Sequence, residues 1–449
     1  MNLVLIHTHD TGRWIEPYGG AVATPNLMKL AQAGTIFRQC FSAAPTCSPS
    51  RAAMLTGMAA HSCGMLGLAH RGFGLSDPRR HAAALLAAQG YETVLCGIQH
   101  EAERAGRLPY TRVISADPIE MDRFTEYDGP AWAAYDRANA AAAVEYLKRA
   151  KGPFFLSFGL FNTHRPFPPS GRPAAAAWVA PPATVADTAD CRADALEYHA
   201  SAAVMDECAG RVLDALAAAG RERDTIVAFT SDHGPAFPGM KCSLTDGGLG
   251  VALLLRYPGN PAAGQAVDAM VSQLDFLPTA FELMDLPRPD HFQGISLLPL
   301  LEGRAERARD ELFAEVTYHA AYEPLRCVRT VRHKYIRRYD AGFRRPVPAN
   351  ADDCPAKDYL VAAGWLETEL PEEELYDLAL DPAEKVNLAA RAASAGRLDE
   401  LRARLADWMR RTGDPLLDGP VPLPPGAFAN RRDCLSPARP DFEYGRAVP

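Results

Sequence analysis

LVLIHTHD, at residues 3–10, begins with a short apolar run at residues 3–6 and ends on two polar side chains, His9 and Asp10. A run of this kind is typical of a strand that is buried on both faces, as strands of parallel sheets are. We therefore expect an α/β fold built on a mostly parallel sheet. Similar runs, rich in β-branched or aromatic residues, occur at residues 93–96, 154–158, 225–230 and 251–255.

Helical patterns separate these runs and would cover both faces of the sheet. Thr24 and Pro25 fit an N-cap and a first helical position, and Gly34 ends the pattern that follows them. Longer stretches with apolar residues at helical spacing occupy residues 132–150 and 193–219. The alternation of strands and helices is that of a sheet sandwiched by helices.

The pattern changes after about residue 305, where strand-like runs follow one another closely. These runs, together with an amphipathic helix over residues 394–411, predict a smaller α+β domain that contains an antiparallel sheet. The last residues are rich in proline and lack periodicity, so we expect a tail packed on the surface. The expected regions are an α/β catalytic domain at 1–305, the α+β domain at 306–414 and the tail at 415–449.

Composition excludes several classes of protein. The chain has 449 residues, 48% of them hydrophobic and 23% charged, and a net charge of -8, which argues against a nucleic-acid partner. No apolar run is long enough for a membrane span, and no signal peptide is visible, so a cytoplasmic location is expected if Met1 is the native start. The ten cysteines form no CxxC pair, which indicates buried free thiols. The sequence carries no signal of the oligomeric state.

One cysteine lies in a different context, in the segment Cys47-Ser48-Pro49-Ser50-Arg51. Ser48 fits an N-cap, and Gly57 fits the residue that ends the following helix, so Cys47 should stand just ahead of a helix N-terminus. Free backbone N–H groups and the Arg51 guanidinium would make this an anion site, and a thiol placed there would have a lowered pKa. The simpler alternative is one more buried thiol at the start of a helix.

Polar side chains follow four of the predicted strands. Because the carboxyl ends of parallel strands meet at one edge of a sheet, these side chains should converge on one site. Taken singly, each could be only a helix cap or a loop-shaping residue; as a set they indicate a functional site. The residues are His9 and Asp10, His100, His164, and Asp232 with His233.

The cysteine segment resembles the Cys-x-Pro-x-Arg signature of sulfatases, members of the alkaline phosphatase superfamily in which this cysteine is oxidised to formylglycine. The stretch from residue 23 to residue 65, together with residues 315–317 and 324–326, is most similar to the N-sulfoglucosamine sulfohydrolase branch. Further sulfatase-like landmarks occur in sulfatase order: Thr24-Pro25-Asn26-Leu27, Thr56-Gly57, residues 271–279 (VSQLDFLPT), residues 374–378 (ELYDL), Asp381-Pro382 and Asn387-Leu388.

The resemblance implies a hydrolase of a sulfate ester or sulfamate on a small molecule or saccharide, matured by a formylglycine-generating enzyme. It places one divalent metal, calcium in most of the family, on His9, Asp10, Asp232, His233 and the oxidised Cys47. One hydroxyl of hydrated formylglycine would attack sulfur while Arg51 and the metal hold the sulfate oxygens. The remaining roles fall on His164 and Lys241, which would assist the leaving group, and on His100, which would deprotonate the second hydroxyl and so release sulfate.

The chain departs from the sulfatase pattern at two positions. His9 stands where an aspartate is usual, which makes Mn²⁺, Zn²⁺ or iron more plausible than calcium if both His9 and His233 are ligands. Alternatively, His9 only stands near the metal and hydrogen-bonds the ester. Ile98 stands where a lysine is usual, so Gln99 or His9 must compensate, or the oxyanion is held differently.

Two other functions are compatible with these residues. A phosphodiester or phosphonate monoester hydrolase of the same superfamily would act on a similar tetrahedral oxyanion. A non-catalytic homologue would keep the anion pocket but never be oxidised at Cys47.

Overall fold

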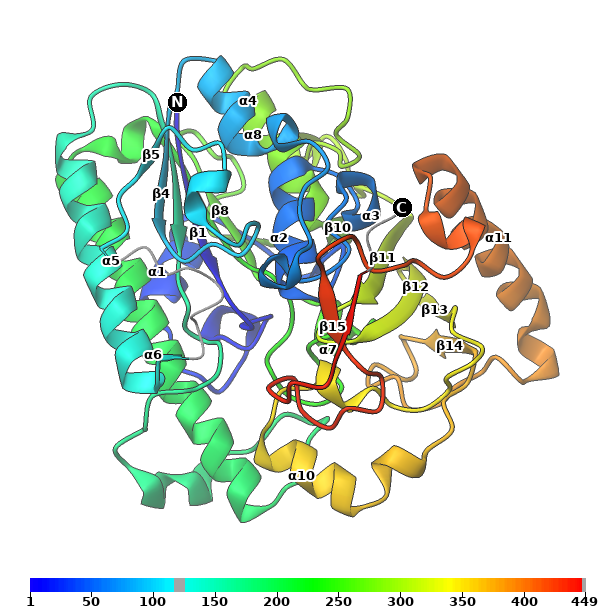
Figure 1. The fold of residues 1–449 in the computed structure, drawn as a ribbon. Coiled ribbons are helices and arrows are strands. Elements are labelled where there is room, and N and C mark those ends of the chain that lie inside the picture. Colours follow the sequence, from blue (N-terminus) through cyan, green and yellow to red (C-terminus); the bar gives the residue numbers. More distant parts are fainter. Residues whose placement is uncertain (117–125, 446–449) are drawn as a thin grey trace.

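The computed structural model describes residues 1–116 and 126–445, and its largest element is a sheet of eight strands (Figure 1). The strand order is β5-β4-β6-β1-β7-β8-β2-β9. The bounds are β1 Asn2–Thr8, β2 Thr35–Phe37, β4 Glu92–Gly97, β5 Arg112–Val113, β6 Phe154–Gly159, β7 Thr225–Ser231, β8 Leu253–Arg256 and β9 Gln265–Val267. A separate short pair joins β3 (Cys40–Phe41) and β10 (Val271–Ser272).

Strand β1 lies in the middle of this sheet and pairs in parallel with β6 and with β7. Strand β4 pairs in parallel with β6, so β1, β4, β6 and β7 all end at the same edge. The mostly parallel sheet is therefore confirmed. Strand β8 runs antiparallel to both of its neighbours, and it begins at Leu253 rather than at residue 251.

Helices cover both faces of the sheet, as the sequence predicted (Figure 1). The alternation of side chains along β1 sends Val4 and Ile6 to one face and Leu3 and Leu5 to the other. Helices α1 (Pro25–Ala33), α5 (Gly129–Arg149) and α6 (Ala189–Ala218) pack on the first face. Helices α2 (Cys47–Thr56), α4 (Ala82–Ala88), α8 (Phe276–Leu283) and α9 (Leu298–Leu301) pack on the second.

A second sheet of four antiparallel strands follows in the chain, in the order β11-β12-β13-β14, which confirms the predicted antiparallel sheet. Helix α11 covers it, and an antiparallel pair, β15 with β16, lies in the tail. The bounds are β11 Glu311–Tyr318, β12 Tyr322–Thr330, β13 His333–Arg338, β14 Glu373–Asp377, α10 Pro355–Ala362, α11 Ala395–Thr412, β15 Phe428–Asn430 and β16 Phe442–Tyr444. The remaining α-helices are α3 (Ala60–Cys63) and α7 (Asp246–Leu249).

A buried ion network joins the second sheet to the segment after α2. Arg326 on β12 is fully buried and pairs with Asp414 (Nε to Oδ2 2.6 Å) and with Glu315 (3.4 Å). Glu315 in turn accepts a hydrogen bond from the backbone N–H of His61, and its carboxylate lies 2.8 Å from the His61 ring nitrogen Nδ1. Charges buried in this way are tolerated only when they are paired.

All ten cysteines are free and buried, as predicted. Among the described residues, no helix has both the length and the apolar character needed to cross a membrane.

We predict that Asp414→Ala lowers the free energy of unfolding by about 3 kcal/mol, because it leaves Arg326 with a single, more distant carboxylate. The matched control is Asp407→Ala, which removes an ion pair to Arg411 whose side chains are more than half exposed, and it should cost less than about 1 kcal/mol. Urea denaturation of both variants measures the difference. Equally small effects would show that the buried network does not stabilise the fold.

Candidate active site

The carboxyl ends of β1 and β7 place two carboxylates side by side. Asp10 follows β1 with a φ of 52°, and its backbone N–H donates to Oδ1 of Asp232 at 2.9 Å. Asp232 follows β7 directly, and both side chains are buried. The parallel pairing of the two strands thus produces the convergence that the sequence argument expected.

Helix α2 brings Cys47 to the same place. Its Sγ lies 3.4 Å from Nε2 of His233 and 4.0 Å from Oδ1 of Asp10. The helix begins at Cys47 itself, with Thr46 as N-cap, so the prediction of Ser48 as N-cap was wrong by two residues. The Ser48 hydroxyl instead accepts a hydrogen bond from the backbone of Ala69. The helix ends at a left-handed Gly57, as expected.

The predicted lowering of the Cys47 pKa was also wrong. Burial raises the pKa of Cys47 well above its usual value, and the negative charges of Asp10 and Asp232 act in the same direction. The positive charges of Lys241 and Arg51 oppose this rise without overcoming it. A thiol in this environment stays protonated and is a poor nucleophile as it stands.

Arg51, on the same helix, is turned toward strand β1. Its guanidinium lies 2.6 Å from Nδ1 of His7 and donates to the Thr8 carbonyl and to Oδ2 of Asp232, at 2.7 and 3.1 Å. Although burial opposes ionisation, His233 and Arg51 hold the pKa of Asp232 well below its usual range. The structure therefore gives Arg51 a contact with Asp232, and it does not place Arg51 among the described residues that line the cavity.

The donor atoms of His9, Asp10, Cys47 and Asp232 lie within 4.8 Å of one another, a spacing suited to a metal ion. Both ring nitrogens of His9 are buried and lack a hydrogen-bond partner in the described part of the chain, although Nδ1 is 3.3 Å from Oδ2 of Asp232. Burial, aided by Arg51, lowers the pKa of His9 to about 3, so its imidazole is neutral and can donate a lone pair. These donors fit a divalent cation.

His233 lies next to this group with a defined orientation. Its Nδ1 is 2.9 Å from the Gly234 carbonyl, which fixes Nδ1 as the protonated nitrogen. In the neutral ring the lone pair is on Nε2, which lies 3.4 Å from Sγ of Cys47 and 3.4 Å from Oδ1 of Asp10. His233 is thus available as a further ligand.

Lys241 reaches the site from the loop after β7. Its Nζ is 2.9 Å from Oδ2 of Asp10, 3.0 Å from Oδ2 of Asp352 and 3.3 Å from Nε2 of His164. Burial disfavours the ammonium, but Asp10 and Asp352 raise the pKa of Lys241 well above its usual value. Asp352 comes from the segment between β13 and β14, and no motif in the sequence marked it.

His100 completes the site together with a histidine that the sequence argument missed. Its Nε2 is 2.9 Å from Nδ1 of His70, and the two rings are stacked. Nδ1 of His100 is buried without a partner among the described residues. One ring nitrogen of His100 belongs to a group of donor atoms that includes His9 and Cys47. Burial lowers the pKa of His100 well below its usual value, so the ring is neutral.

Gln99 and His9 are the two residues expected to compensate for the absent lysine, and only His9 is placed to do so. The Gln99 side chain bonds within its own loop, donating to the Ala102 carbonyl and accepting from the backbone of Glu101. Ile98 is buried in an apolar cluster with Trp132, Tyr135 and Phe161. Gln99 is therefore excluded as a substitute, whereas His9 lines the cavity.

A cavity of about 640 Å³ opens above Cys47, and it is large enough for a sugar-sized ligand. Predicted site residues that line it are His9, Cys47, His100, His164 and Lys241. The second sheet and the tail supply another part of its wall, namely His319, Asp352, Asp353, Phe428, Pro437 and Ala438. The tail thus does more than cover the surface, because it shapes the cavity.

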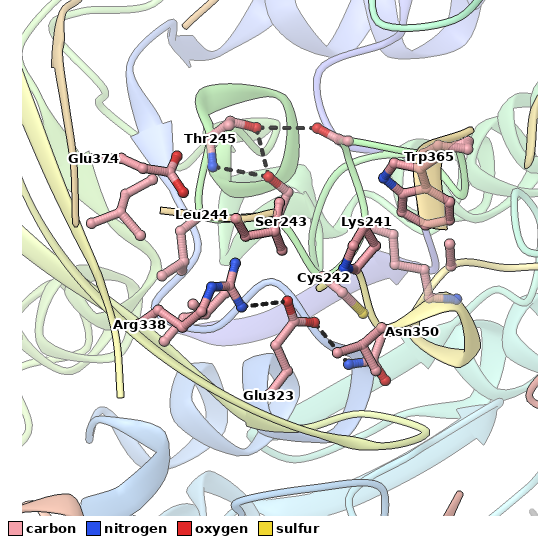
Figure 2. A pocket seen from close by; sticks show the side chains of 18 residues that line it. Lys241, Cys242, Ser243, Leu244, Thr245, Glu323, Arg338, Asn350, Trp365 and Glu374 are labelled. Carbon is pink, nitrogen blue, oxygen red and sulfur yellow. Dashed lines mark hydrogen bonds and ion pairs between the residues drawn. The ribbon is translucent and has the colours of Figure 1, made fainter. Parts of the chain in front are cut away.

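Lys241 also borders a smaller cavity of about 160 Å³ (Figure 2). Figure 2 shows that Glu323, on the wall of this cavity, accepts hydrogen bonds from Arg338 and Asn350, at 3.0 and 2.9 Å. The Glu323 carboxylate is thus already paired, whereas the larger cavity gathers five of the predicted site residues and is the candidate active site.

Comparison with known proteins agrees with this geometry. The family model "Sulfatase" matches residues 1–286, and the model "N-sulphoglucosamine sulphohydrolase, C-terminal" matches residues 241–343. The N-sulphoglucosamine sulphohydrolase of Homo sapiens is 30% identical over 473 aligned residues, which cover 93% of this chain and 92% of that protein.

Solved structures share the fold. One neighbour, described in complex with its substrate D-glucosamine-2-N,6-O-disulfate, has a TM-score of 0.72 at 19% identity and covers 93% of this chain and 99% of its own. A phosphonate monoester hydrolase of Agrobacterium radiobacter has a TM-score of 0.67 at 22% identity, with coverage of 92% and 96%. The fold is thus common to sulfatases and to the phosphonate monoester hydrolase. The sequence matches show that this chain belongs to the sulfatase family and is a sulfuric ester hydrolase.

Proposed function

We propose that this sulfatase hydrolyses a sulfate ester or sulfamate on a saccharide, using a formylglycine made from Cys47 and one divalent metal. The observation that carries the proposal is the buried Cys47 at the start of α2, which lies beside Asp10 and His233 and lines a sugar-sized cavity. The names of the human relative and of the substrate in the neighbouring complex support a saccharide.

The family implies a divalent metal in general, and His9, Asp10, Asp232 and the oxidised residue 47 would hold it, with His233 as a further donor. When bound, the cation would supply Lewis acidity toward the sulfate oxygens and toward the nucleophile. The imidazole of His9 suits Mn²⁺ or Zn²⁺ better than it suits Ca²⁺, which prefers oxygen ligands. Arg51 would keep Asp232 ionised and in place.

Formylglycine would supply a hydrated aldehyde with two hydroxyls, one to attack sulfur and one to restore the aldehyde when sulfate leaves. The protonated Cys47 thiol does not perform this chemistry, which supports oxidation by a formylglycine-generating enzyme. His100, which shares a group of donor atoms with Cys47, is suited to accept a proton from residue 47. Lys241 and His164, 3.3 Å apart, are suited to neutralise or protonate the leaving atom.

Two measurements separate this proposal from the alternatives. Rates on matched aryl sulfate, sulfamate, phosphodiester and phosphonate substrates would reveal a phosphodiester or phosphonate hydrolase, whose fold is shared. Mass spectrometry of the peptide that spans Cys47 would show whether the residue is oxidised. An unmodified cysteine in an otherwise folded, metal-loaded protein would identify a non-catalytic anion-binding homologue.

We predict that Cys47→Ala abolishes turnover, and that Cys47→Ser permits at most a single turnover to a trapped covalent ester. A serine has one hydroxyl, so the step that expels sulfate is missing. Intact-protein mass spectrometry after incubation with substrate detects the ester. Sustained multiple turnover by either variant would contradict the formylglycine mechanism.

We predict that Asp10→Asn and Asp232→Ala each lose most of their bound metal while they remain folded. Asparagine is preferred to alanine at residue 10 because asparagine tolerates the left-handed backbone there. Elemental analysis measures the metal, and circular dichroism checks the fold. Full metal occupancy in Asp232→Ala would show that the proposed metal site is wrong.

We predict that Ile98→Lys lowers kcat/KM by about tenfold or more, because the new ammonium enters an apolar cluster without a carboxylate partner. His9→Asp combined with Ile98→Lys should recover part of the loss and shift metal preference toward calcium. A double-mutant cycle with metal analysis tests this pair. Strictly additive effects on rate, with unchanged metal preference, would show that the two positions are independent and that His9 is not a ligand.

A further inference from the structure

Five arginines in the described part of the chain are buried, and four of them pair with a carboxylate. The exception is Arg71, which is 5% exposed and has no carboxylate within ion-pair distance in residues 1–116 and 126–445. The four pairs are Arg51 with Asp232 (3.1 Å), Arg326 with Asp414 (2.6 Å), Arg329 with Asp246 (2.8 Å) and Arg338 with Glu323 (3.0 Å). Burying an arginine without an anion costs free energy, so an anionic partner is expected for Arg71.

The hydrogen bonds of Arg71 go only to neutral acceptors. One terminal nitrogen donates to the Ala320 carbonyl and to Oδ1 of Asn430, at 3.1 and 2.8 Å, and the other donates to the Pro437 carbonyl at 3.1 Å. The Nε–H group is buried and has no acceptor among the described residues. Since a guanidinium has five N–H donors, these contacts leave it short of acceptors.

Aromatic rings of the tail also contact this guanidinium. Its central carbon lies 5.4 Å from the centre of the Phe428 ring and 5.6 Å from that of Phe442. Such contacts favour a cation but do not neutralise it. Burial lowers the pKa of Arg71 to about 10, so the side chain keeps its positive charge at neutral pH.

Arg71 lines the same cavity as Cys47, so the uncompensated charge faces the substrate site. Two carboxylates of the cavity wall have other partners: Asp352 pairs with Lys241 at 3.0 Å and Asp353 pairs with Lys357 at 2.8 Å. The third, Glu197, lines the cavity without an ion pair to Arg71. No described carboxylate of the cavity wall pairs with Arg71, which makes an anionic group of a bound ligand the natural partner for its charge.

We propose that Arg71 forms a second anion subsite, which binds a carboxylate or sulfate group of the saccharide other than the sulfate group that is hydrolysed at residue 47. This inference rests on the proposed function and extends it, because it assigns a substrate with at least two anionic groups. A guanidinium matches both groups, since each presents two or more oxygens to its N–H donors.

The test compares kcat/KM on a matched series of substrates. The series is 4-nitrophenyl sulfate, glucosamine N-sulfate, the same sugar with a second sulfate on O6, and glucosamine N-sulfate linked to a uronic acid. The two doubly anionic sugars distinguish a second sulfate from a carboxylate. The native enzyme should prefer at least one of them to glucosamine N-sulfate, and Arg71→Gln should reduce that preference by about 10- to 100-fold, mainly through KM.

Asn430→Ala is the matched control, because it removes a tail acceptor of Arg71 but keeps the charge. It should leave the preference between singly and doubly anionic sugars unchanged. If Arg71→Gln and Asn430→Ala instead reduce all substrates alike and lower Tm together, Arg71 only anchors the tail and the subsite is refuted. A native enzyme that hydrolyses the singly and doubly anionic sugars with equal kcat/KM would refute it as well.

A binding measurement distinguishes a failure of the anion subsite from a failure of the proposed function. In the Cys47→Ala background, titration calorimetry should show that Arg71→Gln raises the Kd for the preferred doubly anionic sugar by about 10- to 100-fold, as in the kinetic test. That result would support the subsite even if no sugar in the series is hydrolysed, an outcome that would contradict only the proposed saccharide reaction. An unchanged Kd would refute the subsite whatever the activity.

Discussion

The pairing of β1 with β6 on one side and β7 on the other is the constraint on which the active site depends. It brings Asp10 and Asp232, 222 residues apart in the chain, into direct hydrogen-bonding contact. The same edge of the sheet carries His100 and His164 after β4 and β6. Because parallel strands end at the same edge, polar residues that follow different strands lie close together once the sheet has formed. Together they form a site that no single strand end provides.

Charge balance around the two aspartates sets the character of this site. Each of the two buried carboxylates forms an ion pair: Asp232 with Arg51, and Asp10 with Lys241. Burial lowers the pKa values of His9 and His100, so these two imidazoles offer lone pairs rather than charges. The same burial keeps Cys47 protonated, which fits a residue that is a precursor of the nucleophile rather than the nucleophile itself.

The second sheet and the tail belong functionally to the active site. Asp352 fixes Lys241 from the segment before β14, while the tail supplies Phe428 and Pro437 to the cavity wall. The buried network around Arg326 ties this part of the chain to the residues that follow α2. The polar edge of the large sheet thus follows from the fold, whereas the C-terminal third adds part of the cavity wall.

The sequence by itself determined the two sheets, the helices on both faces, the cysteine segment and the polar residues at the strand ends. These features depend on periodicity, helix capping and residue type, which are local in the chain. Only the tertiary structure decided that Cys47 keeps its proton, that Arg51 holds Asp232, and that His70, Asp352 and Arg71 join the site. The reason is that burial and charge pairing arise between residues far apart in sequence: the Lys241 that pairs with Asp10 and Asp352 is more than one hundred positions from either.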